Sequence, residues 1–166
     1  MIAVNDIEEE RARETVRLLE KSAIRAISVP CDVASDGDVR NMISEVRSHF
    51  GRLDVLVNNA GVVEAGNTPR VVFPELEPER WIRVLDINLR GVLLGTQHAI
   101  AAMRQSGGGV IINISSMAGY MSATPYAVSK LAVRGLTVAF ATELAPHRIR
   151  VNAIAPGLVT TDLVSR

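Results

Sequence analysis

The sequence is short of several features that would assign it to a particular class of protein. It has a single cysteine, Cys31, which cannot form an internal disulfide and has no second cysteine or histidine near it in the chain to complete a metal site. Its apolar runs, such as Val110–Ile114, are far too short to span a bilayer. Lys plus Arg and Asp plus Glu both number 18, so the formal net charge is zero and no basic face for nucleic acid is indicated. We therefore expect a cytoplasmic protein that holds no metal and binds neither nucleic acid nor membrane.

What the sequence does have is an alternation of short β-branched runs with amphipathic helices, which is typical of a parallel sheet covered by helices. The predicted strands are Ile2–Val4, Arg25–Val29, Leu53–Val57, Val110–Ile114 and Ile149–Ala153. The predicted helices run from Ile7 to about Lys21, from Ser35 or Asp36 to Phe50, from Pro78 to about Gln105, and from about Pro125 to Leu144. The chain is long enough for one α/β domain, residues 1–166, with right-handed crossovers.

The strongest chemical pattern is the pair Tyr126 and Lys130 on the last predicted helix. Residues four apart lie on one face of a helix, so the phenol and the ammonium are close together. A free tyrosine has a pKa of about 10, and a fixed cation beside it favours the phenolate, which makes it a better proton donor and acceptor near pH 7. The same spacing also describes an exposed amphipathic pair, so the companions of these two residues decide between the two interpretations.

Those companions follow the predicted strands in a definite order. Asn58–Gly61 and Ser115–Ser116 each end a strand, Asn88 lies within a long helix, and Pro156–Gly157 follow the last strand. In open α/β sheets, ligands bind beyond the carboxyl ends of the strands. With the Tyr126 pattern, this arrangement resembles the short-chain dehydrogenase/reductase family over essentially the whole chain. Within that family the sequence is similar to oxoacyl-carrier-protein reductases and to small sugar or alcohol dehydrogenases, which implies a Rossmann-like, doubly wound parallel sheet.

The resemblance implies an NAD(P)-dependent oxidoreductase that interconverts a ketone and a secondary alcohol by hydride transfer. Tyr126 would act as the acid in ketone reduction and the base in alcohol oxidation, while Lys130 would favour its phenolate and hold the nicotinamide ribose. Ser116 would bind the substrate carbonyl, with Ser115 as the fallback, although two serines that end a strand also fit a simple turn. Asn88 would support a water in the proton relay, or it would merely satisfy a helix carbonyl.

The cofactor preference rests on Asp6, directly after the first visible strand. The family's acidic residue at this position accepts hydrogen bonds from the adenosine ribose and repels a 2′-phosphate, which implies NAD rather than NADP. The structural alternative is a helix N-cap, because Asp6 followed three residues later by Glu9 also fits a capping box. The two roles are compatible.

Other residues match the family's cofactor contacts along the same edge of the sheet. Asp32 and Val33 match the pair beside the adenine. Asn58 matches the adenosine side, and a role in stabilising the sheet fits it equally well. The remaining matches are Ala60, Gly61, Tyr126, Lys130, Pro156, Gly157 and Thr161. Of these, Pro156, Gly157 and Thr161 match the loop that meets the nicotinamide carboxamide, and an ordinary proline-glycine turn is the alternative for them.

Two segments that the family carries are not found in the sequence. No glycine-rich fingerprint precedes Asp6, although the cofactor pyrophosphate normally sits on a glycine turn between the first strand and a helix. In this family the first strand lies at the centre of the sheet, so we expect unpaired edges beside the strand that ends near Val4 and the strand that ends near Val57. The final strand and substrate lid are also missing, and we therefore expect an incomplete Rossmann-like fold, truncated at both ends.

Two hypotheses remain open for the function. The chain is either an internal piece of an active oxidoreductase that acts on a small carbonyl or alcohol substrate, or a non-catalytic remnant or interaction subunit. The resemblance implies a homo-oligomer, a dimer or tetramer in the full-length form, with contacts through the long helices that begin at Pro78 and Pro125. A nucleic-acid-binding module on the same fold has only analogy behind it.

Overall fold

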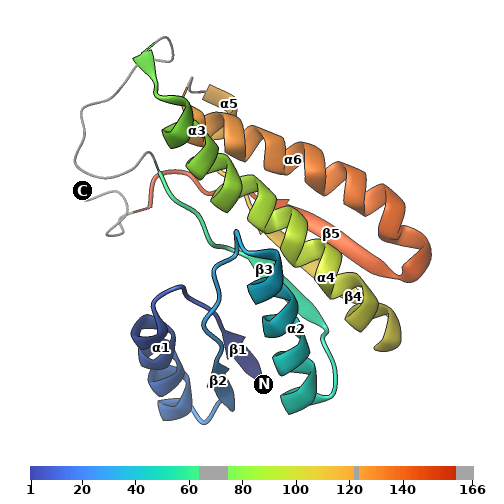
Figure 1. Cartoon of the computed structure of the whole chain (residues 1–166). Helices are drawn as coiled ribbons and strands as arrows, with labels where there is room; N and C mark the ends of the chain where they lie inside the picture. The colour runs from blue at the N-terminus through green and yellow to red at the C-terminus, as the bar shows by residue number, and fades with distance from the viewer. Residues whose placement is uncertain (64–74, 122–123, 160–166) are drawn as a thin grey trace.

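A computed structural model of the chain describes residues 1–63, 75–121 and 124–159 (Figure 1). The strands are β1 (Ile2–Val4), β2 (Ala26–Ser28), β3 (Val55–Asn58), β4 (Gly109–Ile114) and β5 (Ile149–Ile154). The helices are α1 (Glu9–Lys21), α2 (Asp36–Phe50), α3 (Pro78–Leu85), α4 (Gly91–Gln105), α5 (Ala118–Met121) and α6 (Pro125–Leu144). A π-helical turn, η2 (Asp86–Arg90), joins α3 to α4, and a 3₁₀ turn, η3 (Ala145–His147), follows α6.

The strands form two parallel sheets rather than one. Strand β1 pairs only with β2, and the second sheet has the order β3-β4-β5 in the described residues. In the second sheet Val57 is level with Ile112, and Ile112 with Asn152. Among the strands that the structure describes, β1 and β3 therefore each have one edge that no other strand pairs with. This confirms the incomplete Rossmann-like fold, and the interruption falls between the two strands where the sequence indicated it.

Both sheets nevertheless contribute to one hydrophobic core. The inward-facing side chains Ala3, Ile27, Leu56, Ile111 and Val151 come from five different strands and pack in the same cluster. Helices α2, α4 and α6 close this side of the molecule, and Ala99 and Met103 of α4 are fully buried there (Figure 1). The two sheets are thus held by shared helices rather than by each other.

The opposite face of the sheet is covered unevenly. Helix α1 packs on β1 and β2, whereas no described helix has more than minor contact with this face of β3, β4 and β5. Alternation along these strands places Val55 and Val57 on that face, and about half of each side chain is exposed, 51% in both cases. Ile154 is equally exposed, and Ile112 is only half-buried. An apolar patch made by Val55, Val57, Ile112 and Ile154 consequently faces solvent.

The ends of the helices follow from local chemistry. Ser35 caps α2 by accepting a hydrogen bond from the Asp38 N–H, and Gly51 ends the helix in the left-handed conformation, with φ of 73°. Thr124 caps α6 in the same way. The predicted capping box at α1 is wrong: the helix begins at Glu9 after Glu8, and Asp6 instead accepts a hydrogen bond from the Glu8 N–H in a tight turn.

Two further absences can be stated for the described ranges. No helix there is both long and apolar enough to cross a membrane. In the same ranges no three residues among His, Cys, Asp and Glu are grouped in a way that could hold a metal ion.

Candidate active site

The site is built on the first turns of α6, which bring Tyr126 and Lys130 to one face. Pro125 occupies the first helical turn, where its missing N–H costs nothing. The Lys130 ammonium lies 5.6 Å from the centre of the Tyr126 ring. Its Nζ donates a hydrogen bond of 2.7 Å to the carbonyl of Ile114, the last residue of β4. The helix and the strand end therefore fix the position of the lysine together.

Lys130 is an unusual lysine because its side chain is almost fully buried, with 3% exposed. Burial disfavours the charged form and lowers the pKa of its ammonium from 10.5 to about 8. No carboxylate among the described residues forms an ion pair with it. Since an ammonium has three N–H donors and one is used by Ile114, the group retains donors for a ligand.

Asn88 lies in the π-helical turn η2 and is completely buried. Its side-chain oxygen accepts a hydrogen bond of 2.7 Å from the Val62 N–H, and its amide donates to the Val62 carbonyl at 2.8 Å. The same amide donates to Ser129 Oγ at 3.0 Å. The side chain thus joins the loop after β3 to α6, and within the described ranges it has no hydrogen bond to a helix carbonyl, the other role considered for it. π-Helical turns in α-helices occur frequently at functional sites.

Ser129 was missed in the sequence analysis. It is fully buried, its hydroxyl donates to the Tyr126 carbonyl at 2.6 Å, and it accepts from Asn88. It therefore links the turn that carries Tyr126 to the π turn. The spacing of three residues from Tyr126 was a usable signal, because residues three apart are neighbours on the surface of a helix.

Gly61 completes this cluster from the other side. A Cβ atom at this position would lie 3.3 Å from Lys130 Nζ and 3.4 Å from Asn88 Oδ1. Any side chain would consequently press against the ammonium. The structure brings Gly61, Asn88, Tyr126 and Lys130 together, although they are up to 69 positions apart in a chain of 166.

The two serines that end β4 have different surroundings. Ser115 is buried, with 1% exposed, and its hydroxyl donates to the Lys130 carbonyl at 2.8 Å. Ser116 is half-buried, and its Oγ accepts a hydrogen bond from the Ala118 N–H at 3.1 Å. No described residue accepts the hydroxyl proton of Ser116, whereas that of Ser115 is used to hold α6. This favours Ser116 over the fallback.

Asp6, Asp32 and Val33 lie apart from the cluster, beyond the ends of β1 and β2. Asp32 uses its carboxylate to accept a hydrogen bond from the Ala34 N–H at 2.9 Å. Val33 packs against Gly91 at the start of α4, where an added Cβ would lie 3.0 Å from a Val33 methyl. Like Tyr126, these residues lie beyond the carboxyl ends of strands, but next to the β1-β2 sheet rather than the β3-β4-β5 sheet.

The other residues that the resemblance assigns to the cofactor have different surroundings. Asn58 donates to Asn113 Oδ1 at 2.9 Å and to Thr96 Oγ1 at 3.3 Å, so its side chain serves the interior of the sheet. The Pro156 carbonyl accepts a hydrogen bond from Met117 at 3.0 Å. Ala60 and Gly157 are exposed. Thr161 lies outside the described residues.

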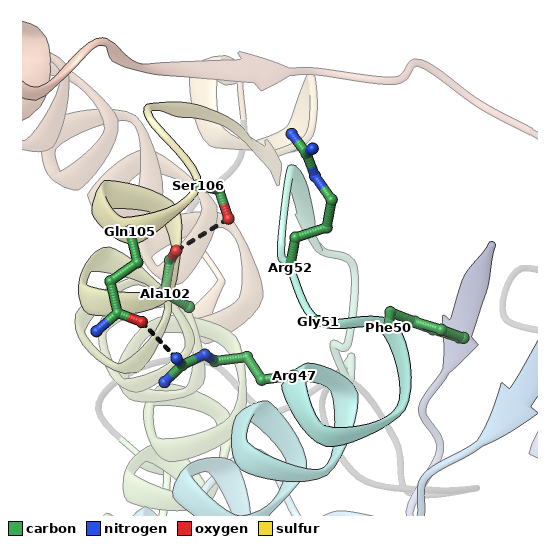
Figure 2. A pocket seen from close by; sticks show the side chains of 7 residues that line it. All are labelled: Arg47, Phe50, Gly51, Arg52, Ala102, Gln105 and Ser106. Carbon is green, nitrogen blue, oxygen red and sulfur yellow. Dashed lines mark hydrogen bonds between the residues drawn. The ribbon is translucent and has the colours of Figure 1, made fainter.

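A surface pocket of about 390 Å³ lies elsewhere (Figure 2). Gly51 and Arg52, before β3, line it together with Ser106, before β4, so it sits at the amino ends of the strands. Figure 2 shows Arg47 turned toward Gln105, to which it donates a hydrogen bond. Tyr126 and Lys130 are at the opposite, carboxyl ends. The pocket is therefore not part of the candidate site.

The chain is similar to known oxidoreductases over nearly its whole length. The chain is 38% identical over 164 residues to an uncharacterized oxidoreductase of Thermotoga maritima, a match that covers 97% of this chain and 62% of the relative. It is 38% identical over 165 residues to the 5-keto-D-gluconate 5-reductase of Escherichia coli, covering 98% of this chain and 63% of that protein. This chain therefore spans less than two thirds of the length of these relatives.

Solved structures of this kind of enzyme are also similar to the chain over nearly its whole length. A gluconate 5-dehydrogenase from Burkholderia cenocepacia, in complex with NADP and tartrate, superposes with a TM-score of 0.87 and 34% identity over 97% of this chain and 62% of that chain. A short-chain type dehydrogenase/reductase from Mycobacterium marinum superposes with a TM-score of 0.91 and 34% identity, covering 98% and 64%. The family model described as short chain dehydrogenase matches residues 1–166. The chain therefore belongs to the short-chain dehydrogenase family.

Proposed function

We propose that this chain carries the catalytic half of an NAD(P)-dependent oxidoreductase that interconverts a ketone and a secondary alcohol. The observation that carries the proposal is Lys130, a buried ammonium without a carboxylate partner in the described residues, held 5.6 Å from the ring of Tyr126. Burying such a charge costs stability, so a lysine in this position is best explained by a role in binding or chemistry.

The proposed mechanism assigns each side chain one task. The Ser116 hydroxyl donates a hydrogen bond to the substrate oxygen, and Tyr126 donates a proton to that oxygen in reduction or removes it in oxidation. Lys130 holds its ammonium 5.6 Å from the centre of the Tyr126 ring. Asn88 and Ser129 hold the Tyr126 turn in place, because they connect it to the π turn. When bound, a nicotinamide cofactor would supply or accept the hydride.

The residues present fit one part of that cofactor. Lys130 has free N–H donors for the nicotinamide ribose hydroxyls, and the lack of a side chain at Gly61 leaves space beside its Nζ. Asp6 and Asp32 offer carboxylates near the adenosine end. The described residues include no glycine-rich turn that leads from a strand into a helix for the pyrophosphate.

The first experiment is a titration of the purified 166-residue chain with NADH, followed by cofactor fluorescence, with circular dichroism to confirm the fold. Saturable binding supports the proposal and leads to turnover assays with a panel of secondary alcohols. Tyr126→Phe is then expected to remove most of the turnover and leave NADH binding within about twofold, because it deletes one hydroxyl and little shape.

The matched control is the other tyrosine of the chain, Tyr120, which is half exposed on α5 and stacks under Arg134. Tyr120→Phe should leave turnover unchanged. Equal activity of Tyr126→Phe and the unaltered chain would overturn the role of Tyr126.

The finer preference for NAD rests on Asp6. Its carboxylate is half-buried and accepts a hydrogen bond from the Glu8 N–H, which leaves further lone pairs for a ribose hydroxyl. Asp6→Ala should weaken NADH binding relative to NADPH. Since the Burkholderia cenocepacia relative is solved with NADP, both cofactors belong in the assay. An unaltered ratio would leave Asp6 as a turn residue.

The alternative, a non-catalytic remnant or interaction subunit, is favoured by one observation, the free edges of β1 and β3. A folded chain that binds neither NADH nor NADPH would support it. Cytoplasmic location stays a prediction.

We also propose that the protein self-associates through α6 and the neighbouring α3. Val128, Leu131 and Val138 form an exposed apolar stripe at helical spacing, with 37%, 50% and 68% of each residue exposed. Ile82 of α3 is also exposed, at 53%. Leu131→Glu should shift the sedimentation coefficient toward that of a monomer of 17.9 kDa, whereas Leu18→Glu on α1 should not.

A further inference from the structure

A chain of hydrogen bonds runs through the buried layer between the β3-β4-β5 sheet and its helices, next to the candidate site. Asn58, the last residue of β3, donates from Nδ2 to Asn113 Oδ1 at 2.9 Å and to Thr96 Oγ1 at 3.3 Å. The Asn113 amide donates to Thr137 Oγ1 at 3.0 Å, and the Thr137 hydroxyl donates to the Val133 carbonyl at 2.7 Å. These bonds connect α4, β3, β4 and α6.

The polar side chains of this chain lie where an unbonded group is costly. Asn113 and Thr96 are completely buried, and Thr137 is 8% exposed. A buried polar group without a partner costs free energy, whereas a satisfied network holds its members in one arrangement. The single hydroxyl proton of Thr137 is used on Val133, so towards Asn113 this hydroxyl can only accept. The bond from β4 to α6 therefore has a defined direction.

The apolar contacts of α6 hold the helix on the sheet without such a direction. Phe140 and Leu144 belong to the same core cluster as Ile149 and Val151 of β5. Hydrophobic attraction is roughly proportional to the buried area and has no preferred orientation. A directional bond therefore adds what burial alone lacks, a defined rotation of α6 on the sheet.

Strand β4 supplies two directional bonds to points that are seven residues apart on α6. The Ser115 hydroxyl donates to the Lys130 carbonyl at 2.8 Å, and the Asn113 amide donates to Thr137. Residues seven apart lie on nearly the same face of a helix, about 10 Å apart along its axis. One bond would let the helix pivot, whereas two bonds fix its rotation and its axial position. The Lys130 side chain starts from one of these points and reaches the Ile114 carbonyl.

We infer that Asn113 and Thr137 are positioning residues for Lys130. Their hydrogen bond holds α6 at the rotation in which the ammonium lies on the Ile114 carbonyl, near the ring of Tyr126. The described hydrogen bonds of both side chains go to groups other than the ammonium, so they act through the helix. The catalytic consequence rests on the proposed function, whereas the position of the ammonium is a property of the folded chain.

The test follows the titration of Lys130 by NMR in the 166-residue chain, labelled with ¹³C at the lysine ε carbons. The chain has two lysines, and the exposed Lys21 gives the reference signal. Burial lowers the pKa of the Lys130 ammonium from 10.5 to about 8. Thr137→Val removes the acceptor of the Asn113 bond with little change of shape. The pKa of Lys130 should then move toward 10.5 by at least about 0.5, because a displaced ammonium is less buried.

Matched variants separate the rotation of α6 from the stability of the fold. Thr137→Ser keeps the hydroxyl and should leave the pKa of Lys130 within about 0.2 of its value in the unaltered chain. Thr142→Val removes an exposed hydroxyl of α6 that donates to the Val138 carbonyl at 3.0 Å and has no described bond to the sheet. Ser35→Ala removes the cap of α2 and lowers stability without a change in α6. Neither of these two variants should move the pKa of Lys130.

Each outcome bears on the inference. Circular dichroism checks that every variant is folded, and Thr137→Ala replaces Thr137→Val if the valine variant is not. An unchanged pKa of Lys130 in the Thr137 variant, or an equal change in Thr142→Val or Ser35→Ala, would overturn the inference. Titration of Lys130 together with Lys21 in the unaltered chain would also overturn it.

A second readout follows turnover of a secondary alcohol. Thr137→Val should lower kcat at least about fivefold without a matching rise in KM, because the ammonium is displaced from the reacting groups and substrate contacts stay. Thr142→Val should leave both constants unchanged. Absence of turnover in the unaltered chain would count against the proposed function, whereas the lysine titration would still decide the position of the ammonium.

Discussion

Replacement of Lys130 by methionine should raise the free energy of unfolding near neutral pH. In alkali the variant should lose this advantage over the unaltered chain. The buried charge destabilises the fold, because the pKa falls from 10.5 to about 8 and this difference corresponds to about 3 kcal/mol. Below pH 8 the folded chain holds the charge and carries the full penalty. Between pH 8 and 10.5 the unfolded chain binds more protons than the folded chain, so stability rises with pH.

The Lys130→Met variant has no charge at this position, so its stability does not rise with pH in this way. Met has a similar length and no charge, but it loses the hydrogen bond to Ile114, which costs about 1 to 2 kcal/mol at every pH. Lys130→Met is therefore expected to be about 1 to 2 kcal/mol more stable at pH 7. The assay is urea unfolding at pH 7 and pH 10, followed by circular dichroism.

The sharper quantity is the difference between the two pH values. The unaltered chain should gain about 2 to 3 kcal/mol over the variant from pH 7 to pH 10, and the lost hydrogen bond cancels in this comparison. The other lysine, Lys21, is exposed and common to both chains. Parallel pH profiles of the two proteins would refute the claim that burial governs the charge of Lys130.

Three further predictions concern the fold. Gly95→Ala should lower the free energy of unfolding by about 2 kcal/mol, because its Cβ would lie 2.5 Å from Asn58 Oδ1. Gly135 has open space around it, so Gly135→Ala should raise the free energy of unfolding by about 1 kcal/mol. Equal shifts of the two variants in urea unfolding would contradict this. Cys31, 4% exposed and with its pKa raised to about 11 mainly by burial, should react with iodoacetamide at pH 8 at least about 100-fold more slowly than in the unfolded chain, as followed by mass spectrometry. Ser35→Ala should cost about 1 kcal/mol through the lost helix cap, and Ser35→Asp should restore most of it.

Much of the fold could be predicted from the sequence. In α2 and α6 the spacing of apolar residues and the capping or proline residues at the helix ends indicate the same bounds. Helix α6 has the predicted bounds, since Pro125 starts it and Pro146 lies just beyond its end. Helix α2 begins after Ser35, one of the two predicted caps. The free edges beside β1 and β3 were also expected, because the resemblance gives the strand order and the sequence shows no strand for the central place.

The sequence could not show local hydrogen bonding that several spacings allow. The segment from Pro78 to Gln105 reads as one helix, and a π turn preserves enough of the helical period to escape notice. Asp6 and Glu9 fit a capping box by spacing, but the chain enters α1 two residues later. Similarly, the site pair Tyr126 and Lys130 was visible in the sequence, whereas the hydrogen bond from Asn88 to Ser129 joins residues 41 positions apart and needed the fold to bring them together.

The π turn also sets the rotational phase of the helix that precedes it. Each residue in an α-helix turns the chain by about 100°, so removal of one residue from Asp86–Arg90 would convert the turn to regular helix and rotate all of α3 by that angle. Val84, now buried with 3% exposed, would be turned out of its buried position, and the surface around Ile82, now 53% exposed, would turn with it. One extra residue in the chain therefore positions the amide of Asn88 and selects which side of α3 is left for contact with another molecule.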